Sequence, residues 1–152
     1  MQDIAFQLVL KWAREGEDKD ILLTDDYTRL TLDTIALCTM DYRFNSFYSE
    51  AMHPFVEAMS GVLSHAQKTA TRPGLYNKVF GSTEEKQFKE DQATMNRIAQ
   101  EVIDRRRANP VDKDDLLNTM LHKKDPKTGA LMRDELIITN MITFLVAGHE
   151  TT

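Results

Sequence analysis

The sequence predicts a mainly α-helical fold, and two features of its pattern support this prediction. Apolar residues recur three and four positions apart along almost the whole chain, the spacing that lines one face of a helix. The strict apolar–polar alternation of a half-buried strand is nearly absent. The chain has 152 residues, of which 41% are hydrophobic and 28% charged, a balance that suits one globular domain.

Two helices are predicted in the first 40 residues. The first ends near Gly16 and is marked by Ile4, Leu8, Val9 and Trp12. Thr24 is expected to cap the second helix, with Asp25 and Asp26 close to the positive end of its dipole. The expected inward face of this helix consists of Tyr27, Leu30, Thr34, Ile35 and Cys38.

A polar, turn-rich break over residues 41–46 precedes a third predicted helix. Pro54 suits its first turn, and His53 is expected to act as a cap or turn residue before it. The apolar face of this helix is expected to hold Phe55, Met59, Val62 and Leu63. Residues 71–81 contain one proline and two glycines, so we expect a movable loop there.

A capping box is predicted to open a long fourth helix, and it consists of Ser82, Thr83, Glu84 and Glu85. The helix is expected to stop before Asn109 and Pro110. Its apolar positions are Phe88, Met95, Ile98, Val102 and Ile103. A short helix is expected around residues 114–122, followed by a turn over residues 125–129.

A final helix is predicted to begin near Asp134 and to continue to the end of the chain. Between Ile137 and Ala147 it is apolar on most sides, so we expect it to be buried all round, in the centre of something larger. The helix is too short, and too acidic at its start, for a membrane span.

Charge and cysteine content narrow the function classes. The net charge is −5 and no long basic run occurs, so no nucleic-acid-binding surface is expected. The one basic cluster, at residues 105–107, is interpreted as complementing the C-terminal end of the long helix. A single cysteine excludes a disulfide framework, and the segment after Met1 resembles neither a signal peptide nor a membrane anchor. We therefore expect a cytoplasmic protein.

The segment most suggestive of chemistry is the last one, Ala147-Gly148-His149-Glu150-Thr151-Thr152. Glycine inside a helix costs about 1 kcal/mol relative to alanine, and buried polar groups need partners. A sequence that breaks its own local rules in this way often marks a functional site. Small residues let a flat ligand approach the backbone closely, and a carboxylate beside a hydroxyl can relay protons.

This segment resembles the oxygen-activation motif of cytochromes P450, in which a small residue and glycine are followed by any residue, an acid and threonine. Residues 143–152 are similar to that stretch in self-sufficient fatty-acid hydroxylases of bacteria and fungi, where a P450 domain is fused to a diflavin reductase. Further segments that resemble the same group are residues 28–35, 41–48, 53–55, 114–117 and 124–129. The resemblance is loosest over residues 64–83.

The resemblance implies the middle helices of the cytochrome P450 fold, truncated within the long helix that crosses the haem. Residues 1–152 would then be part of one haem domain. The N-terminal part, the Glu-x-x-Arg brace, the haem-cysteine loop and the reductase domains are not found in the chain and are expected to lie outside it. The isolated chain is therefore expected to be inactive.

Residue roles also follow from the resemblance. Ala147 and Gly148 would lie against the haem, while Thr151 would help to deliver protons, with Glu150 as its partner. No metal ligand is expected, because Cys38 lies in an apolar helical setting and is interpreted as a small buried hydrophobic residue.

The implied substrate is a medium- or long-chain fatty acid. Val146 would face this substrate, and Met59 and Leu63 would belong to the lid of its channel, although their helical spacing suits core packing equally well. Haem b with a thiolate ligand would activate dioxygen. Electrons would come from NADPH through FAD and FMN of a reductase, which is expected to be fused to the haem domain.

Three other interpretations fit parts of the sequence. A free-standing helical module that binds a ligand or partner without haem would leave the most apolar helix, which is the last one, without later elements to cover it. A glycine-kinked helix end needs no function at all. The stretch from His149 would begin a zinc-protease motif only if a histidine followed Thr152, and such helices do not require the upstream segments.

Overall fold

The computed structural model describes the backbone of residues 1–16, 20–49, 51–71 and 74–150, and the side chains of these residues except 74–82 and 150. Within these ranges the chain forms helices and no strand, as the sequence predicted. The helices are α1 (Gln2–Glu15), α2 (Leu23–Met40), the short 3-10 helix η1 (Ser46–Tyr48), α3 (Pro54–Thr71), α4 (Gly74–Ala108), α5 (Leu116–His122) and α6 (Asp134–Glu150).

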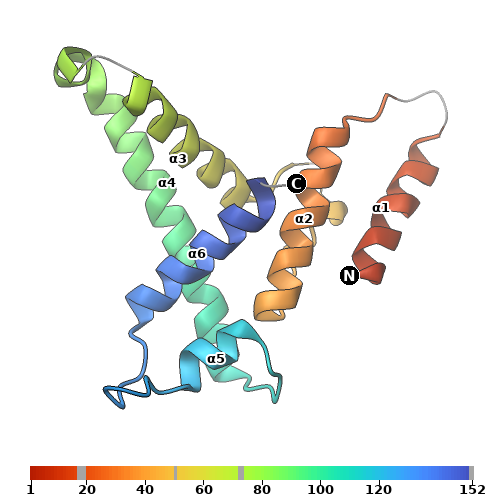
Figure 1. Ribbon diagram of the computed structural model, residues 1–152. Helices are drawn as coiled ribbons and strands as arrows, with labels where there is room; N and C mark the ends of the chain where they lie inside the picture. Colours follow the sequence, from red (N-terminus) through yellow and green to blue (C-terminus); the bar gives the residue numbers. More distant parts are fainter. Residues whose placement is uncertain (17–19, 50, 72–73, 151–152) are drawn as a thin grey trace.

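The helices are arranged around α6. α3 and α4 lie side by side as an antiparallel pair, and α6 runs between this pair and α2 (Figure 1). α1 lies along the other side of α2, and α5 packs against α2 and α6 at the lower end in this view. No helix in the described part of the chain has the length and apolar character needed to cross a membrane.

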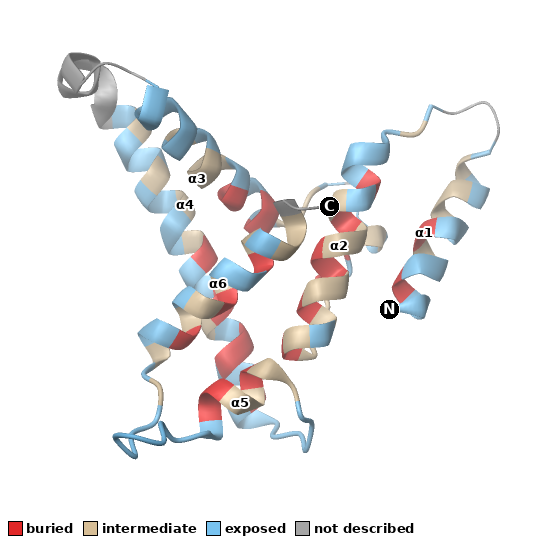
Figure 2. Ribbon diagram, in the orientation of Figure 1, coloured by how far each residue is buried: buried red, intermediate tan, exposed pale blue. Residues whose placement is uncertain are grey.

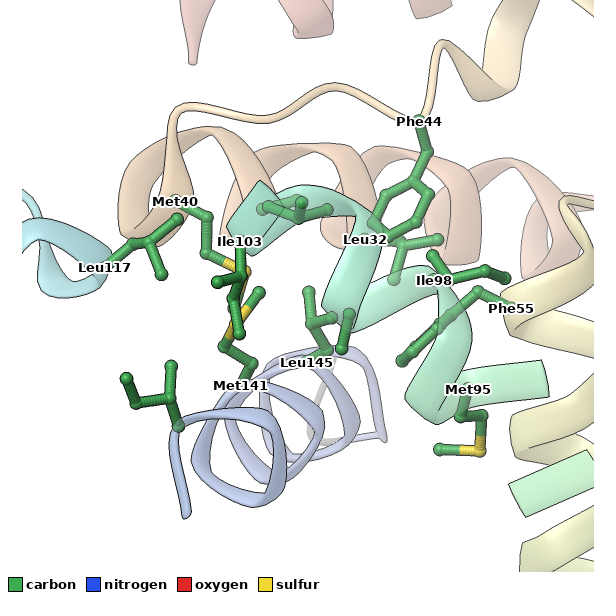
Figure 3. Close-up of a cluster of buried hydrophobic side chains, with 14 of the residues drawn as sticks. Leu32, Met40, Phe44, Phe55, Met95, Ile98, Ile103, Leu117, Met141 and Leu145 are labelled. Atoms are coloured by element: carbon green, nitrogen blue, oxygen red, sulfur yellow. The ribbon is translucent and has the colours of Figure 1, made fainter. Parts of the chain in front are cut away.

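One hydrophobic core joins α2, α3, α4, α5 and α6. Its fully buried members include Leu32, Phe55, Met59, Ile103, Leu117, Ile137 and Met141. Figure 3 shows Met141 and Leu145 of α6 directed toward side chains of α4 and α2. Burial of each large apolar side chain stabilises the fold by roughly 1.5–3 kcal/mol, so this core holds α6 in place.

Helix α1 ends where the sequence predicted. Ile4 and Leu8 are its buried residues, while Val9 is exposed. Gly16 follows the helix with a φ of +79°, a conformation that glycine adopts without steric cost.

The buried face of α2 differs from the predicted one. Its buried residues are Asp26, Arg29, Leu32, Asp33, Ala36 and Met40. Tyr27 and Cys38 were predicted to face inward but are exposed. The other predicted inward residues, which are half-buried, are Leu30, Thr34 and Ile35. Leu22 stands at the N-cap instead of Thr24. The prediction was wrong because it assigned charged residues to the outside, whereas three of them are buried here.

Two of these charges hold the chain that follows α2. Asp33 accepts hydrogen bonds from the backbone N–H groups of Phe44 (2.7 Å) and Ser46 (2.9 Å). Arg29 donates hydrogen bonds to the carbonyl oxygens of Ser46 and Ser49, the latter over 2.8 Å. Buried charges persist only with such partners, so the chain after residue 43 is fixed to α2.

The third buried charge fastens α1 to α2. Asp26 accepts a hydrogen bond from the indole Nε1 of Trp12 (2.6 Å) and forms an ion pair with Lys11. Burial opposes ionisation of Asp26, but these two partners outweigh it and hold the pKa of the carboxyl below its ordinary value.

Helix α3 begins at Pro54, as predicted, and His53 caps it. The carbonyl of His53 accepts the Val56 N–H (2.8 Å), and its ring Nδ1 accepts the Phe55 N–H (3.1 Å). The predicted apolar face is confirmed in that Phe55 and Met59 are fully buried. Val62 and Leu63 are half-buried and pack against the core.

Helix α4 begins earlier than the sequence predicted. It starts at Gly74, so the loop expected over residues 71–81 is wrong for residues 74–81, and the helix start expected at Ser82 is wrong as well. Residues 72–73 of the expected loop lie outside the described residues. Each glycine costs a helix only about 1 kcal/mol, which the rest of a 35-residue helix can offset once it has formed. The predicted end before Asn109 is confirmed.

The three arginines at the end of α4 have separate partners. Arg106 is buried and binds Asp115 through both guanidinium ends, over 3.0 Å and 2.8 Å, and also donates to the Met40 carbonyl (2.7 Å). Arg107 forms a two-point ion pair with Asp134 (2.6 Å and 2.7 Å). The Arg105 guanidinium lies over the Tyr42 ring, 5.5 Å from its centroid. The three arginines therefore join α4 to other elements, in addition to complementing the negative end of its helix dipole.

The short helix and the turn after it are also confirmed. Asp115 is the N-cap of α5 and accepts the Asn118 N–H over 2.8 Å. Asp125 accepts two backbone N–H groups in the turn that follows, and Gly129 closes that turn with a φ of +69°.

Helix α6 begins at Asp134, as predicted, but only one face of it is buried. That face consists of Ile137, Met141 and Leu145, spaced one helical turn apart. Leu136 and Phe144 on other faces are 48% and 41% exposed. Within the described chain α4 and α2 cover one side of α6 and not the other (Figure 2), so burial on all sides in a larger protein stays a prediction.

Candidate functional site

The C-terminal part of α6 carries the residues that the sequence singled out. Val146 is half-buried and packs against the core, while the next residue, Ala147, is exposed. Gly148 and His149 are half-buried. The Glu150 side chain, and Thr151 and Thr152 entirely, lie outside the described residues. The predicted transfer of protons by Glu150 and Thr151 therefore stays a prediction.

Gly148 lies against helix α2. A Cβ atom placed on Gly148 would lie 2.8 Å from Cγ1, 3.1 Å from Cδ1 and 3.2 Å from Cβ of Ile35. Ordinary carbon contacts are about 3.5–4.0 Å, so only glycine fits between the backbone of α6 and this side chain. The absence of a side chain at Gly148 thus lets α6 approach α2.

Ala147 belongs to a different side of α6. Consecutive helical residues are about 100° apart around the axis, because a turn holds 3.6 residues. The exposed side chains on the open side include Leu136, Thr143, Phe144 and Ala147. A flat, apolar molecule could lie on this surface, which we call the open face of α6 and define by these four residues.

The predicted substrate residues of α3 are not on the open face. Met59 is fully buried in the hydrophobic core, and Leu63 is half-buried against it. Both residues therefore pack in or against the core, as their helical spacing allowed. Neither forms an open pocket with Ala147 in the described structure.

Two cavities were missed by sequence reasoning. One of about 320 Å³ lies between α3, α4 and α6 and is lined by Val62, Gln92, Met95, Asn96, Thr139, Ile142 and Thr143. A larger one of about 520 Å³ lies between α1, α2 and η1 and is lined mainly by charged and polar residues. None of the predicted site residues lines either cavity, and no local signal in the sequence marks contacts between helices so far apart in the chain.

The donor set of the described residues does not form a metal site. No group of three or more histidine, cysteine, aspartate or glutamate residues in the described ranges could hold a metal ion. Cys38 is an exposed free thiol on α2, so its interpretation as a buried hydrophobic residue is wrong. It is exposed because the buried face of α2 is rotated toward Asp33 and Ala36.

Comparison with known proteins identifies the family. The sequence model of the cytochrome P450 family matches residues 1–152, and the chain therefore belongs to the cytochrome P450 family. Its six α-helices in the described ranges are consistent with a fragment of that mainly α fold. The resemblance inferred from the motif is confirmed.

The chain is similar to several fungal fusion proteins. It is 57% identical over 152 residues to a bifunctional cytochrome P450/NADPH–P450 reductase of Aspergillus oryzae. It is also 57% identical over 152 residues to the self-sufficient cytochrome P450 monooxygenase CYP505U2 of Exserohilum turcicum. A third relative, the bifunctional cytochrome P450/NADPH–P450 reductase ascE of Acremonium egyptiacum, is 52% identical over 154 residues. Each match covers 100% of this chain and 14% of the relative.

Proposed function

We propose that the chain is part of the haem domain of a self-sufficient monooxygenase that hydroxylates fatty acids. The observation that carries this proposal is the motif at the end of α6, where small Ala147 is exposed and Gly148 lets the helix pack closely on α2. The relatives support it, because their names describe P450 monooxygenases and fusions to NADPH–P450 reductase.

We propose that a flat prosthetic group lies on the open face of α6. Ala147 and Phe144 are exposed there, and they offer apolar contact without a bulky side chain at Ala147. When bound, haem b with a thiolate ligand supplies the chemistry that activates dioxygen. We assign Ala147 to the contact with the ring and Gly148 to the backbone beside it.

The remaining site residues are assigned by chemistry. The Thr151 hydroxyl would hold a proton next to the reacting oxygen, and the Glu150 carboxylate would replace it from solvent. Val146, Met59 and Leu63 would form the apolar wall that orients a fatty-acid chain and excludes water. Because Met59 is in the core of the described structure, its place in this wall requires that α3 shift.

We also propose that the iron ligand comes from another part of the longer protein. Cys38 is the only cysteine of the chain and lies within α2, where its neighbours are helical and lack the glycine-containing loop that surrounds a haem thiolate in this family. Residues 1–152 would thus be one part of a haem domain and inactive alone. FAD and FMN of a fused reductase would pass electrons from NADPH, in the cytoplasm.

The experiment uses the full-length protein. We expect a saturated C12 fatty acid to be hydroxylated when NADPH and oxygen are supplied, and Thr151→Ala to lower the product formed per NADPH consumed, with more hydrogen peroxide released. Thr152→Ala is the matched control and should keep the coupling. No hydroxylated product from fatty acids of any length would contradict the substrate class, and unchanged coupling in Thr151→Ala would contradict the proton role.

A further inference from the structure

Gly148 meets the stiff part of its neighbour's side chain. The atoms closest to a Cβ at Gly148 include Cγ1 and Cβ of Ile35, at 2.8 Å and 3.2 Å. Ile35 is β-branched and lies on a helix, where one χ1 rotamer is strongly preferred. The side chain therefore cannot rotate away cheaply, and the separation of α2 and α6 at this point is set by Ile35 itself.

The contact fixes α6 at a second point along its length, on the same side as Met141, because a step of seven residues makes almost two helical turns. Met141 and Leu145 pack α6 into the hydrophobic core, and Gly148 packs it against α2. Ala147, between these contacts in the sequence, is exposed. Because the two contacts lie on both sides of Ala147 along the chain, they determine where its methyl group sits on the open face of α6.

We infer that Ile35 is a positioning residue: through its contact with Gly148 it sets the place of Ala147 on the open face of α6. Gly148 then serves the contact between helices, while Ala147 faces the ligand. In relation to haem, the inference rests on the proposed function. The inference thus assigns different roles to Ala147 and Gly148, which the sequence motif does not distinguish.

Two substitutions at Ile35 test whether the contact with Gly148 is steric. Ile35→Ala removes Cγ1 and Cδ1, the atoms at 2.8 Å and 3.1 Å, and leaves only Cβ, at 3.2 Å, so a small shift of the helices makes room for a methyl group at Gly148. Ile35→Val removes one methyl group but keeps branching at Cβ, so it leaves the obstruction. Each is combined with Gly148→Ala in the full-length protein.

Two measurements are made on every variant: the midpoint of thermal unfolding, and the Soret position of the ferric haem with the shift that a C12 fatty acid induces. Gly148→Ala alone should lower the midpoint by several degrees and alter the Soret shift, although alanine favours helices over glycine. Adding Ile35→Ala should restore both toward the values of the Ile35→Ala single variant. Adding Ile35→Val should restore neither.

Three results would overturn the inference. Gly148→Ala could leave both measurements unchanged, or Ile35→Ala could restore the midpoint but not the Soret shift, which would place the role of Gly148 on the haem side. Equal rescue by Ile35→Val would contradict the steric contact. If the wild-type protein binds no haem, the proposed function fails, while the unfolding midpoints still test the contact between Ile35 and Gly148.

Discussion

At the scale of single residues, buried charges determine how the elements join. Arg106 connects the end of α4 to the N-cap of α5 and to the last carbonyl of α2. Burial opposes ionisation of Asp115, but hydrogen bonds from Arg106 and from the Asn118 N–H outweigh it and keep the pKa of Asp115 below its ordinary value. A charge buried with this many partners cannot be removed cheaply.

Arg106→Met should therefore lower the free energy of unfolding by about 3–5 kcal/mol, because it leaves the Asp115 carboxylate buried without its partner. Arg107→Met is the matched control, since Arg107 pairs with Asp134 in a largely exposed ion pair and should cost about 0–1 kcal/mol. Urea unfolding of the complete haem domain measures both. Equal losses would contradict the difference in burial.

His53 gives stability a defined dependence on pH. Burial lowers the pKa of His53 below 6.5, outweighing the carboxylates of Asp33 and Glu101, which raise it. The neutral ring accepts the Phe55 N–H, and protonation of Nδ1 would remove that acceptor. Between the folded pKa and 6.5 the unfolded chain binds more protons, so the contribution is complete above 6.5 and falls as pH decreases through this window.

We therefore expect the unfolding free energy of the wild type to fall when pH is lowered from 7 toward 5, and His53→Asn to flatten that part of the curve. Asparagine can still cap a helix but does not titrate. The measurement is urea unfolding at a series of pH values. A wild-type curve parallel to that of His53→Asn would show that His53 does not titrate in this window.

At the scale of elements, the length of α4 is the main departure from the predicted pattern. Glycine and proline favoured a loop over residues 71–81, yet α4 begins at Gly74. Helix growth adds a hydrogen bond for each residue, so an established helix extends through weak formers. Packing of α3 along α4 supplies further support.

Gly81→Ala tests this continuity. In a helix interior the change should raise the free energy of unfolding by up to about 1 kcal/mol, whereas a loop position would show little change. Gly16→Ala is the control with the opposite sign, because its φ of +79° disfavours alanine although space for the methyl group is available. Destabilisation by Gly81→Ala would argue against the extended helix.

At the scale of the whole molecule, the open face of α6 is the surface on which the proposed function depends. Leu136 and Phe144 are exposed on the most apolar helix, while the opposite side of that helix lies in the core. The chain spans 14% of the length of its curated relatives. The rest of a haem domain would cover this face.

The isolated chain, when mixed with hemin, should therefore form no thiolate-ligated site. After reduction and addition of carbon monoxide, we expect no Soret band of the thiolate type, and Cys38→Ala should give the same spectrum. A thiolate band that disappears in Cys38→Ala would assign the iron ligand to Cys38 and overturn this assignment.

The sequence by itself determined the helical class, most helix ends, the cap at His53 and the family. These features depend on neighbouring residues: Gly16 ends α1, Pro54 begins α3, and the motif from Ala147 is continuous in the chain. Local pattern and local structure agree wherever the determining contacts lie within a few residues.

Only the tertiary structure decided which sides of the helices are buried. The partners of Asp33 and Arg106 lie outside the helices that carry these two residues. The spacing of apolar residues in α2 and α4 therefore does not predict that Asp33 and Arg106 are buried. The contact between Ile35 and Gly148 joins residues far apart in the chain. Sequence pattern reports what each segment prefers alone, whereas the cost of burying a charge or omitting a side chain depends on the atoms that the fold brings beside it.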